Sequence, residues 1–409
     1  MGKSNAALKE AFDQLMADTR IQQVLAFIEQ DHPRTIAEQI ALTEIPAPPF
    51  KEQQRAENFM KRLENLGLEK VRMDTEGNVY GVRKGRGQGP KIFVSAHLDT
   101  VFPEGTDTTV HQKEGVLYAP GIGDDTRGLA ELLAVVRAFN EAAIETSGDI
   151  LFGGTVGEEG AGDLRGVKAF FTEHRDIDAF LSLDGPGAHA ITYLATGSYR
   201  YRVTYKGPGG HSFAAFGTPS ATHALGRAMA EIADLETPGQ PKTTFSIGEV
   251  SGGTSVNAIA QEASMLVDLR SNDQLELDKL EQRFLAIVEH AAIAENNRWN
   301  DDRLRVETER FGNRPPAKQS ADASIVQIAS AALHALGAEP ELKEPSSTDA
   351  NYPMSIGIPA ITIGLGGKFD NAHTLEEWHD PTKGHFAIQK SLMTILGLAG
   401  VEGVSRPLL

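Results

Sequence analysis

The sequence predicts an α/β protein with a mostly parallel central sheet, helices on both faces of it, and a smaller inserted α+β domain. Short apolar runs alternate with helical patterns before residue 198 and again after residue 311, which is typical of a buried parallel sheet. Between these segments polarity alternates residue by residue, as in half-exposed strands. The predicted domains are therefore residues 1–197 with 312–409, and residues 198–311.

The elements follow this division in order. The N-terminal part reads as helices, and "FKEQQRAENFMKRLENLGLEK" ends at Gly67, a frequent helix stop. The first domain then continues with the strands "KIFVSAHLD", "DILFGGTVGEE" and "IDAFLSLDG", and with the helices "DDTRGLAELLAVVRAF" and "RGVKAFFTEH". In the insertion, "SYRYRVTYKG", "ASMLVDLRS" and "LRVETERF" predict strands, and residues 218–236 and 273–295 predict helices. The strand "PAITIGLGG" and a last helix from His385 complete the first domain.

Composition excludes several classes of protein. With 40% hydrophobic and 23% charged residues the chain is typical of a globular domain, and no run approaches the roughly 20 apolar residues of a membrane helix. The formal net charge of −17 disfavours nucleic acid and anionic membranes as partners. The chain has no cysteine and no apolar segment of a secretory signal near its start, so we expect a cytoplasmic protein.

Five polar clusters follow predicted strands or open predicted helices. They are "SAHLD" (His97, Asp99), "GIGDD" (Asp124, Asp125), "GEEG" (Glu158, Glu159), "LSLDG" (Asp184) and "DNAHTLEEWH" (His373). Open α/β sheets bind ligands at the carboxyl ends of their strands, so the five clusters can share one crevice. Imidazole and carboxylate ligands without thiolate suit Zn²⁺, with Co²⁺ or Mn²⁺ as substitutes.

Taken singly, each cluster has a plainer interpretation: a packed histidine, loop charge, or acids that complement a helix dipole. Their succession at strand ends favours a metal site. His97 and Asp99 face the same side of an extended segment, so the Asp99 carboxylate can hold the far imidazole nitrogen. The chain can turn at Gly160, so that one glutamate of the Glu158–Glu159 pair binds metal while the other faces a bound water.

These motifs together resemble the M20 family of dinuclear zinc metallopeptidases. The resemblance runs in family order from about residue 40 to the C-terminus. It also includes "GPGGHSFAAFGTPSATHALGRAM", "GGTSVNAIAQEASMLVDLRS" and "SSTDANYPMSIGIPAITIG". It implies a zinc-exopeptidase fold whose insertion is a lid, through which some relatives form a homodimer while others are monomers.

The resemblance also implies two Zn²⁺ per chain and a role for each candidate residue. His97 and Asp184 would bind one ion, Glu159 and His373 the other, and Asp124 would bridge the two. Glu158 would be the general base, and Asp99 would orient His97. In the lid, His211 would stabilise the oxyanion, often in the partner's site, while Asn257 and Arg270 would bind substrate polar groups; a structural ion pair is an equal alternative for Arg270.

Two positions bear on specificity. Many relatives have D-D-K-G-G where this chain has Asp124-Asp125-Thr126-Arg127-Gly128, so the lysine is absent. Aspartate at position 184 resembles the aminopeptidase, dipeptidase and tripeptidase branch, whereas glutamate is commoner in carboxypeptidases and deacylases. We therefore expect an exopeptidase that hydrolyses short peptides from the free N-terminus. The alternatives are an amidohydrolase or carboxypeptidase acting on N-acyl amino acids, and a non-catalytic peptide-binding relative.

Overall fold

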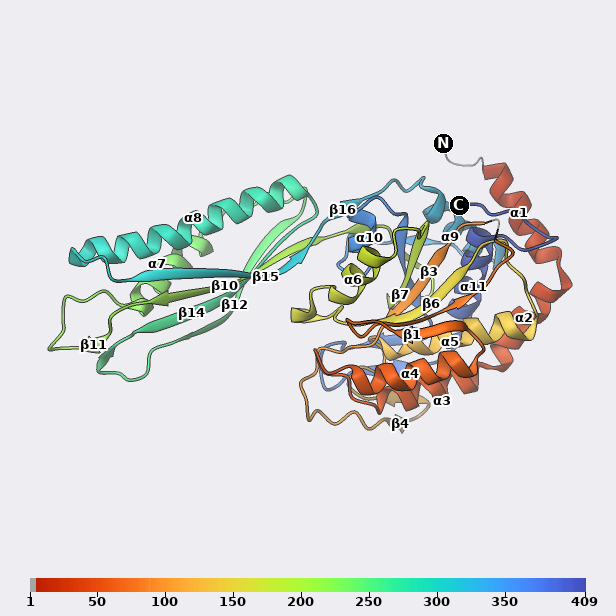
Figure 1. Cartoon of the computed structure of the whole chain (residues 1–409), viewed down its shortest axis with the longest axis horizontal. Helices are drawn as coiled ribbons and strands as arrows, with labels where there is room; N and C mark the ends of the chain where they lie inside the picture. The colour runs from red at the N-terminus through yellow and green to blue at the C-terminus, as the bar shows by residue number, and fades with distance from the viewer. Residues whose placement is uncertain (1–4, 88) are drawn as a thin grey trace. The chain divides into compact units, whose positions relative to one another are not determined.

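The structure is a computed structural model that describes residues 5–87 and 89–409 (Figure 1). The chain divides into two compact units, Met1–Ala195 with Lys318–Leu409, and Thr196–Ala317. The boundaries expected at residues 198 and 311 fall inside strands β10 (Gly197–Lys206) and β15 (Arg305–Arg314). Polarity alternation locates these strands but not their first and last residues.

The first unit is built on an eight-stranded sheet with the order β1-β2-β6-β3-β7-β18-β8-β17. Its strands are β1 (Glu69–Met73), β2 (Val79–Arg83), β3 (Ile92–His97), β6 (Ile150–Thr155), β7 (Ala179–Pro186), β8 (Ala190–Thr192), β17 (Glu341–Leu342) and β18 (Ala360–Leu365). The central strands β6, β3, β7 and β18 run parallel, whereas β1, β2 and β8 join antiparallel. The mostly parallel sheet predicted from the apolar runs is confirmed.

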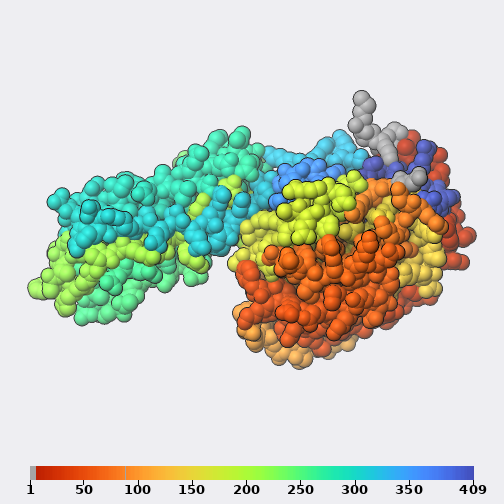
Figure 2. Space-filling view, in the orientation of Figure 1, coloured from red at the N-terminus to blue at the C-terminus, as the bar shows by residue number. Residues whose placement is uncertain are grey.

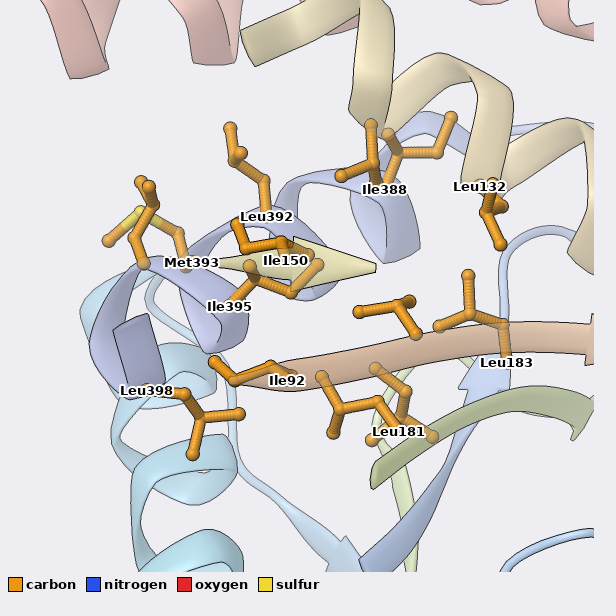
Figure 3. Close-up of a cluster of buried hydrophobic side chains, with 14 of the residues drawn as sticks. Ile92, Leu132, Ile150, Leu181, Leu183, Ile388, Leu392, Met393, Ile395 and Leu398 are labelled. Atoms are coloured by element: carbon orange, nitrogen blue, oxygen red, sulfur yellow. The ribbon is translucent and has the colours of Figure 1, made fainter. Parts of the chain in front are cut away.

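Helices cover both faces of this sheet. They are α1 (Asn5–Ala17), α2 (Thr19–Gln30), α3 (His32–Thr43), α4 (Gln53–Asn65), α5 (Thr126–Glu141), α6 (Arg165–Glu173), α9 (Ser324–Ala335), α10 (Asn351–Ser355) and α11 (His385–Ala399). Successive residues of a strand point to opposite faces. Ile92 belongs to the buried cluster that also contains Leu132 of α5 and Leu392 of α11 (Figure 3), while Phe93 stacks on Phe170 of α6 with ring centroids 3.9 Å apart. In Figure 2 the N-terminal helices form much of the visible surface of this unit.

The same unit contains a small four-stranded sheet whose hydrogen-bonded strand order is β19-β20-β5-β4. Its strands are β4 (His111–Lys113), β5 (Val116–Tyr118), β19 (Lys368–Asp370) and β20 (Trp378–Asp380). Strands β19 and β20 pair antiparallel and form a hairpin whose loop contains His373. Among the described residues, no helix has both the length and the apolar character needed to cross a bilayer.

The second unit is an antiparallel sheet with the order β12-β14-β10-β15. Strands β12 (Thr243–Gly252) and β14 (Glu262–Ser271) complete it, and helices α7 (Ala221–Ala233) and α8 (Gln274–Trp299) pack on one face. Every second side chain of β10 is buried against these helices: Tyr199, Tyr201, Val203 and Tyr205. A separate two-stranded ribbon joins β11 (Gly210–His211) to β13 (Ala258–Ile259).

The central strand β7 supplies a test of the core of the first unit. Leu181 is fully buried among side chains of the sheet (Figure 3), so Leu181→Ala should lower the free energy of unfolding by about 2–5 kcal/mol. Leu342, on the edge strand β17, is 43% exposed, and its change to alanine should cost less than about 1 kcal/mol. Urea unfolding measures both, and equal losses would contradict this description of the core.

Candidate metal centre

The polar clusters of the first unit meet at one edge of the parallel sheet. His97 is the last residue of β3, Glu158 and Glu159 follow β6, and Asp184 lies near the end of β7. Because these three strands are parallel neighbours, their carboxyl ends lie together. Asp124 lies two residues before the first residue of helix α5, and His373 lies in the β19–β20 loop.

The ligating atoms form overlapping groups, in each of which all atoms lie within 4.8 Å of one another. One group contains His97, Asp124 and Asp184, and a second contains Asp124, Glu159 and His373. Asp124 belongs to both. Its Oδ1 lies 2.8 Å from Nε2 of His97, and its Oδ2 lies 3.1 Å from Nε2 of His373. One carboxylate thus faces a different imidazole with each oxygen, which is the arrangement of a bridging ligand.

The electrostatics of the cluster fit a cation. Burial raises the pKa of Glu159 to about 7, although a hydrogen bond with His373 opposes the shift, and the charges of Asp124 and Glu158 add to it. Burial and the charge of Asp124 likewise raise the pKa of Asp184 well above its usual range. Hydrogen bonds to Asp124 and Glu159 raise the pKa of His373 to about 10, so the site favours positive charge. Oxygen and imidazole donors grouped around a shared carboxylate fit a pair of divalent ions.

Two buried aspartates hold the ligand-bearing segments in place. Asp125 accepts the backbone N–H of His97 at 2.8 Å with Oδ2, and that of Gly128 at 3.2 Å with Oδ1. It therefore ties the start of α5 to the end of β3. The Asp99 carboxylate accepts the backbone N–H groups of Glu158 at 3.1 Å and Glu159 at 2.8 Å.

The orientation of His97 differs in detail from the sequence interpretation. That interpretation assigned the far nitrogen to the carboxylate of Asp99. The nearest acceptor to Nδ1 is instead the backbone carbonyl of Asp99 at 3.0 Å, and the carboxylate oxygen lies 3.7 Å away. The physical reason is that the carboxylate is turned toward the backbone of the glutamate pair. Asp99 thus contacts both His97 and the Glu158–Glu159 turn.

Glu377 is a site residue that the sequence reasoning missed. Its side chain is fully buried, and it accepts backbone N–H groups of Gly121 at 2.8 Å, Gly123 at 2.7 Å and Asp124 at 3.0 Å. It lies in the same loop as His373, so it ties that loop to the segment carrying Asp124. No local pattern marks it, because its three partners lie more than 250 positions away in the sequence.

The remaining candidates lie in the second unit. His211 and Asn257 are adjacent on the β11–β13 ribbon, where the N–H of Ser212 donates to the carbonyl of Asn257 at 2.9 Å. Nδ1 of the exposed His211 accepts backbone N–H groups of Phe213 at 3.2 Å and Ala214 at 3.3 Å. Arg270, on β14, forms an ion pair with Asp268, with 2.5 Å between Nε and Oδ2. This contact agrees with the structural ion pair given above as the alternative to a substrate contact.

A mostly parallel sheet with grouped imidazole and carboxylate donors at its carboxyl edge is typical of an α/β enzyme that binds divalent metal. Residues 93–391 match the model of Peptidase family M20/M25/M40, and the chain belongs to this family. The protein is therefore a hydrolase of a family of dinuclear metal-binding peptidases.

Three relatives illustrate the range of the family. The chain is 25% identical over 334 residues to the succinyl-diaminopimelate desuccinylase of Corynebacterium glutamicum, which covers 80% of this chain and 86% of that enzyme. A tripeptidase from Staphylococcus aureus superposes with a TM-score of 0.73 and 23% identity over 89% of this chain and 97% of its own. The Bacillus subtilis YXEP protein, a dinuclear metal-binding peptidase, superposes with a TM-score of 0.65 and 19% identity over 90% and 99%. At these identities the two structures support the fold alone.

The buried carboxylate of Glu377 supplies a test of the centre. Glu377→Gln replaces one acceptor oxygen by an NH₂ group that opposes the backbone N–H donors, so the segment carrying Asp124 should shift. Because Asp124 lies in both ligand groups, both ions should bind about 10–100-fold more weakly. Zn²⁺ titration of the metal-free protein measures this. The exposed neighbour Glu376, changed to glutamine, is the control, and equal affinity in wild type and Glu377→Gln would overturn the assignment.

Proposed function

We propose that this protein is a zinc-dependent exopeptidase of the cytoplasm that removes the N-terminal residue from short peptides. The observation that carries the proposal is the pair of ligand groups that share Asp124, with the buried Glu158 beside them. Zn²⁺ is the proposed ion because the donors are imidazole and carboxylate and the chain has no cysteine. When bound, a pair of divalent ions polarises the scissile carbonyl and favours deprotonation of the attacking water.

Glu158 is the proposed general base. A ligating atom of Glu158 lies within 4.8 Å of those of His97 and Glu159, yet Glu158 belongs to neither group that contains Asp124. Glu159, by contrast, has Oε1 at 2.9 Å from Nε2 of His373. The division of roles follows: Glu159 binds metal, and Glu158 takes the proton of the attacking water and delivers it to the leaving amine.

His211 is the proposed donor to the oxyanion. Its Nδ1 accepts two backbone N–H groups, so in the neutral imidazole the proton is on Nε2. Nε2 can therefore donate a hydrogen bond to the negative oxygen that develops on the scissile carbonyl. Asn257 directly precedes β13 and accepts the backbone N–H of Ser212, and we propose that it contacts the substrate there.

The separation of His211 and Arg270 within the second unit supports a homodimer. The β11–β13 ribbon adjoins the end of the sheet where Lys206 pairs with Glu262, while Arg270 pairs with Ser198 at the other end. Eight strand residues between these ends span about 27 Å, whereas a tripeptide spans about 10 Å. If both side chains contact one short peptide, they come from two chains. We therefore propose that His211 and Asn257 act in a partner's site and that Arg270 acts in its own.

An amidohydrolase acting on N-acyl amino acids is the second candidate, because a desuccinylase is among the relatives. A panel of dipeptides and tripeptides, assayed beside N-acetyl and N-succinyl amino acids, separates the two. We expect release of the first residue from the peptides. Turnover of the acyl substrates alone would replace the peptidase proposal.

Glu158→Gln tests the general base. The change removes the proton acceptor while leaving both Asp124 groups intact, so kcat should fall by about 10²–10⁴-fold. Metal analysis of the same sample should still give two ions per chain, which distinguishes loss of the base from loss of metal. Near-normal kcat with both ions bound would refute Glu158 as the general base. The division of roles between Glu158 and Glu159 would then also be refuted.

Mixing two inactive variants tests the shared site. If His211 acts in the partner's site, a dimer of one His211→Ala chain and one Glu158→Gln chain contains one complete site. Random reassociation should then restore about a quarter of wild-type activity. Each variant alone should stay at its low level. No recovery after demonstrated subunit exchange would contradict action across the dimer.

A further inference from the structure

Helix α5, which begins two residues after Asp124, contains a buried ion pair. Arg127 and Glu131 of α5 are both fully buried, and Nε of Arg127 donates to Oε1 of Glu131 at 2.8 Å. Desolvation of two buried charges offsets most of their attraction, so such a pair contributes little net stability by itself. A role in positioning other groups is a better account of its presence.

The pair binds both ends of the β19–β20 hairpin, whose loop carries His373. Nη2 of Arg127 donates to the carbonyl of Gly384 at 3.0 Å, just after β20. Oε1 of Glu131 accepts the N–H of Gly366 at 2.6 Å, just before β19. The two glycines touch, because a Cβ at Gly366 would lie 2.0 Å from the Gly384 carbonyl oxygen. Arg127 and Glu131 therefore hold the base of the hairpin at the point where its two strands converge.

Two further buried side chains, His379 and Lys390, contact the backbone that leads into β19. His379 of β20 lies within hydrogen-bonding distance of the Gly366 carbonyl with Nε2, at 2.9 Å, and of Nε2 of Gln39 with Nδ1, at 3.1 Å. Burial, together with the charge of Arg127, lowers the pKa of His379 to about 3, so its imidazole is neutral. Lys390 of α11 donates to the carbonyl of Gly364 at 2.5 Å and provides a second positive charge near Glu131.

We propose that Arg127 and Glu131 are positioning residues that fix His373, and with it the second metal position, relative to Asp124. Both ligands depend on the same helix: Asp124 and Asp125 precede its first residue, and the hairpin of His373 rests on its first turns. The guanidinium suits this task because its planar fork reaches Glu131 and Gly384 at the same time, which a single ammonium does not. Many relatives have a lysine in the segment that is Asp124–Gly128 in this chain. Here the basic residue of that segment is Arg127, which we propose supports the metal site.

The expected effect is selective for one of the two ions. In Arg127→Met the contact with Gly384 is lost, while Lys390 still provides a counter-charge for Glu131. The ion bound by Glu159 and His373 should bind about 10–100-fold more weakly, and the ion bound by His97 and Asp184 should keep its affinity. Arg127→Lys keeps the charge but not the fork, so we expect an intermediate loss.

Titration of the metal-free full chain with Co²⁺ measures the two affinities from the absorption of the bound ion, without reference to activity. Arg137→Met is the matched control. Arg137 lies on the same helix, about 15 Å further along, and forms a buried ion pair with Asp31 at 2.7 Å. Thermal unfolding of each variant records any general loss of stability.

Selective weakening of the second ion in the Arg127 variants, with both ions retained in Arg137→Met, supports the proposal. It is overturned if the Arg127 variants bind both ions as tightly as wild type. It is equally overturned if Arg137→Met weakens the second ion to the same extent, because the pair would then act only through general stability. If Arg127→Met does not fold, Arg127→Lys alone decides by the same criteria.

Discussion

The structure depends on a concentration of negative charge at one edge of its parallel sheet. Asp124, Glu158, Glu159 and Asp184 lie together there, and burial with mutual repulsion raises the pKa of Glu159 and of Asp184. Such a cluster is costly unless positive charge is placed within it. Two histidines approach the two oxygens of Asp124, and these histidines with Asp124, Glu159 and Asp184 are donors that suit a pair of divalent ions. The proposed hydrolytic role of this site depends on that arrangement.

Buried acidic groups outside the candidate ligand set hold the backbone segments that carry it. Asp125 ties the start of α5 to the end of β3, Asp99 holds the turn of the glutamate pair, and Glu377 holds the segment of Asp124. Each of these acids accepts backbone N–H groups. The network joins strand ends, a helix start and a hairpin that are distant in sequence. Hydrogen bonds that orient metal ligands from outside the ligand set affect the affinity and geometry of metal sites.

Much of this was predictable from sequence. The strands β3, β6 and β18 are mostly apolar and fully buried, so the parallel sheet could be inferred, and the polar clusters near the strand ends indicated the residues of the candidate site. The partner of His97 could not be inferred, because the choice between a carbonyl and a carboxylate of Asp99 depends on a local turn. Glu377 and Glu131 could not be found either. Their roles come from contacts between segments more than 200 residues apart, which no local pattern encodes.

The account rests on two ions that share Asp124, and a crystal grown with saturating Zn²⁺ and measured at the zinc absorption edge tests it most directly. We predict two anomalous peaks about 3.5–4 Å apart, one beside His97 and Asp184 and the other beside Glu159 and His373. The Asp124 carboxylate should contact both peaks. A single peak, or two peaks that do not share this carboxylate, would contradict the account.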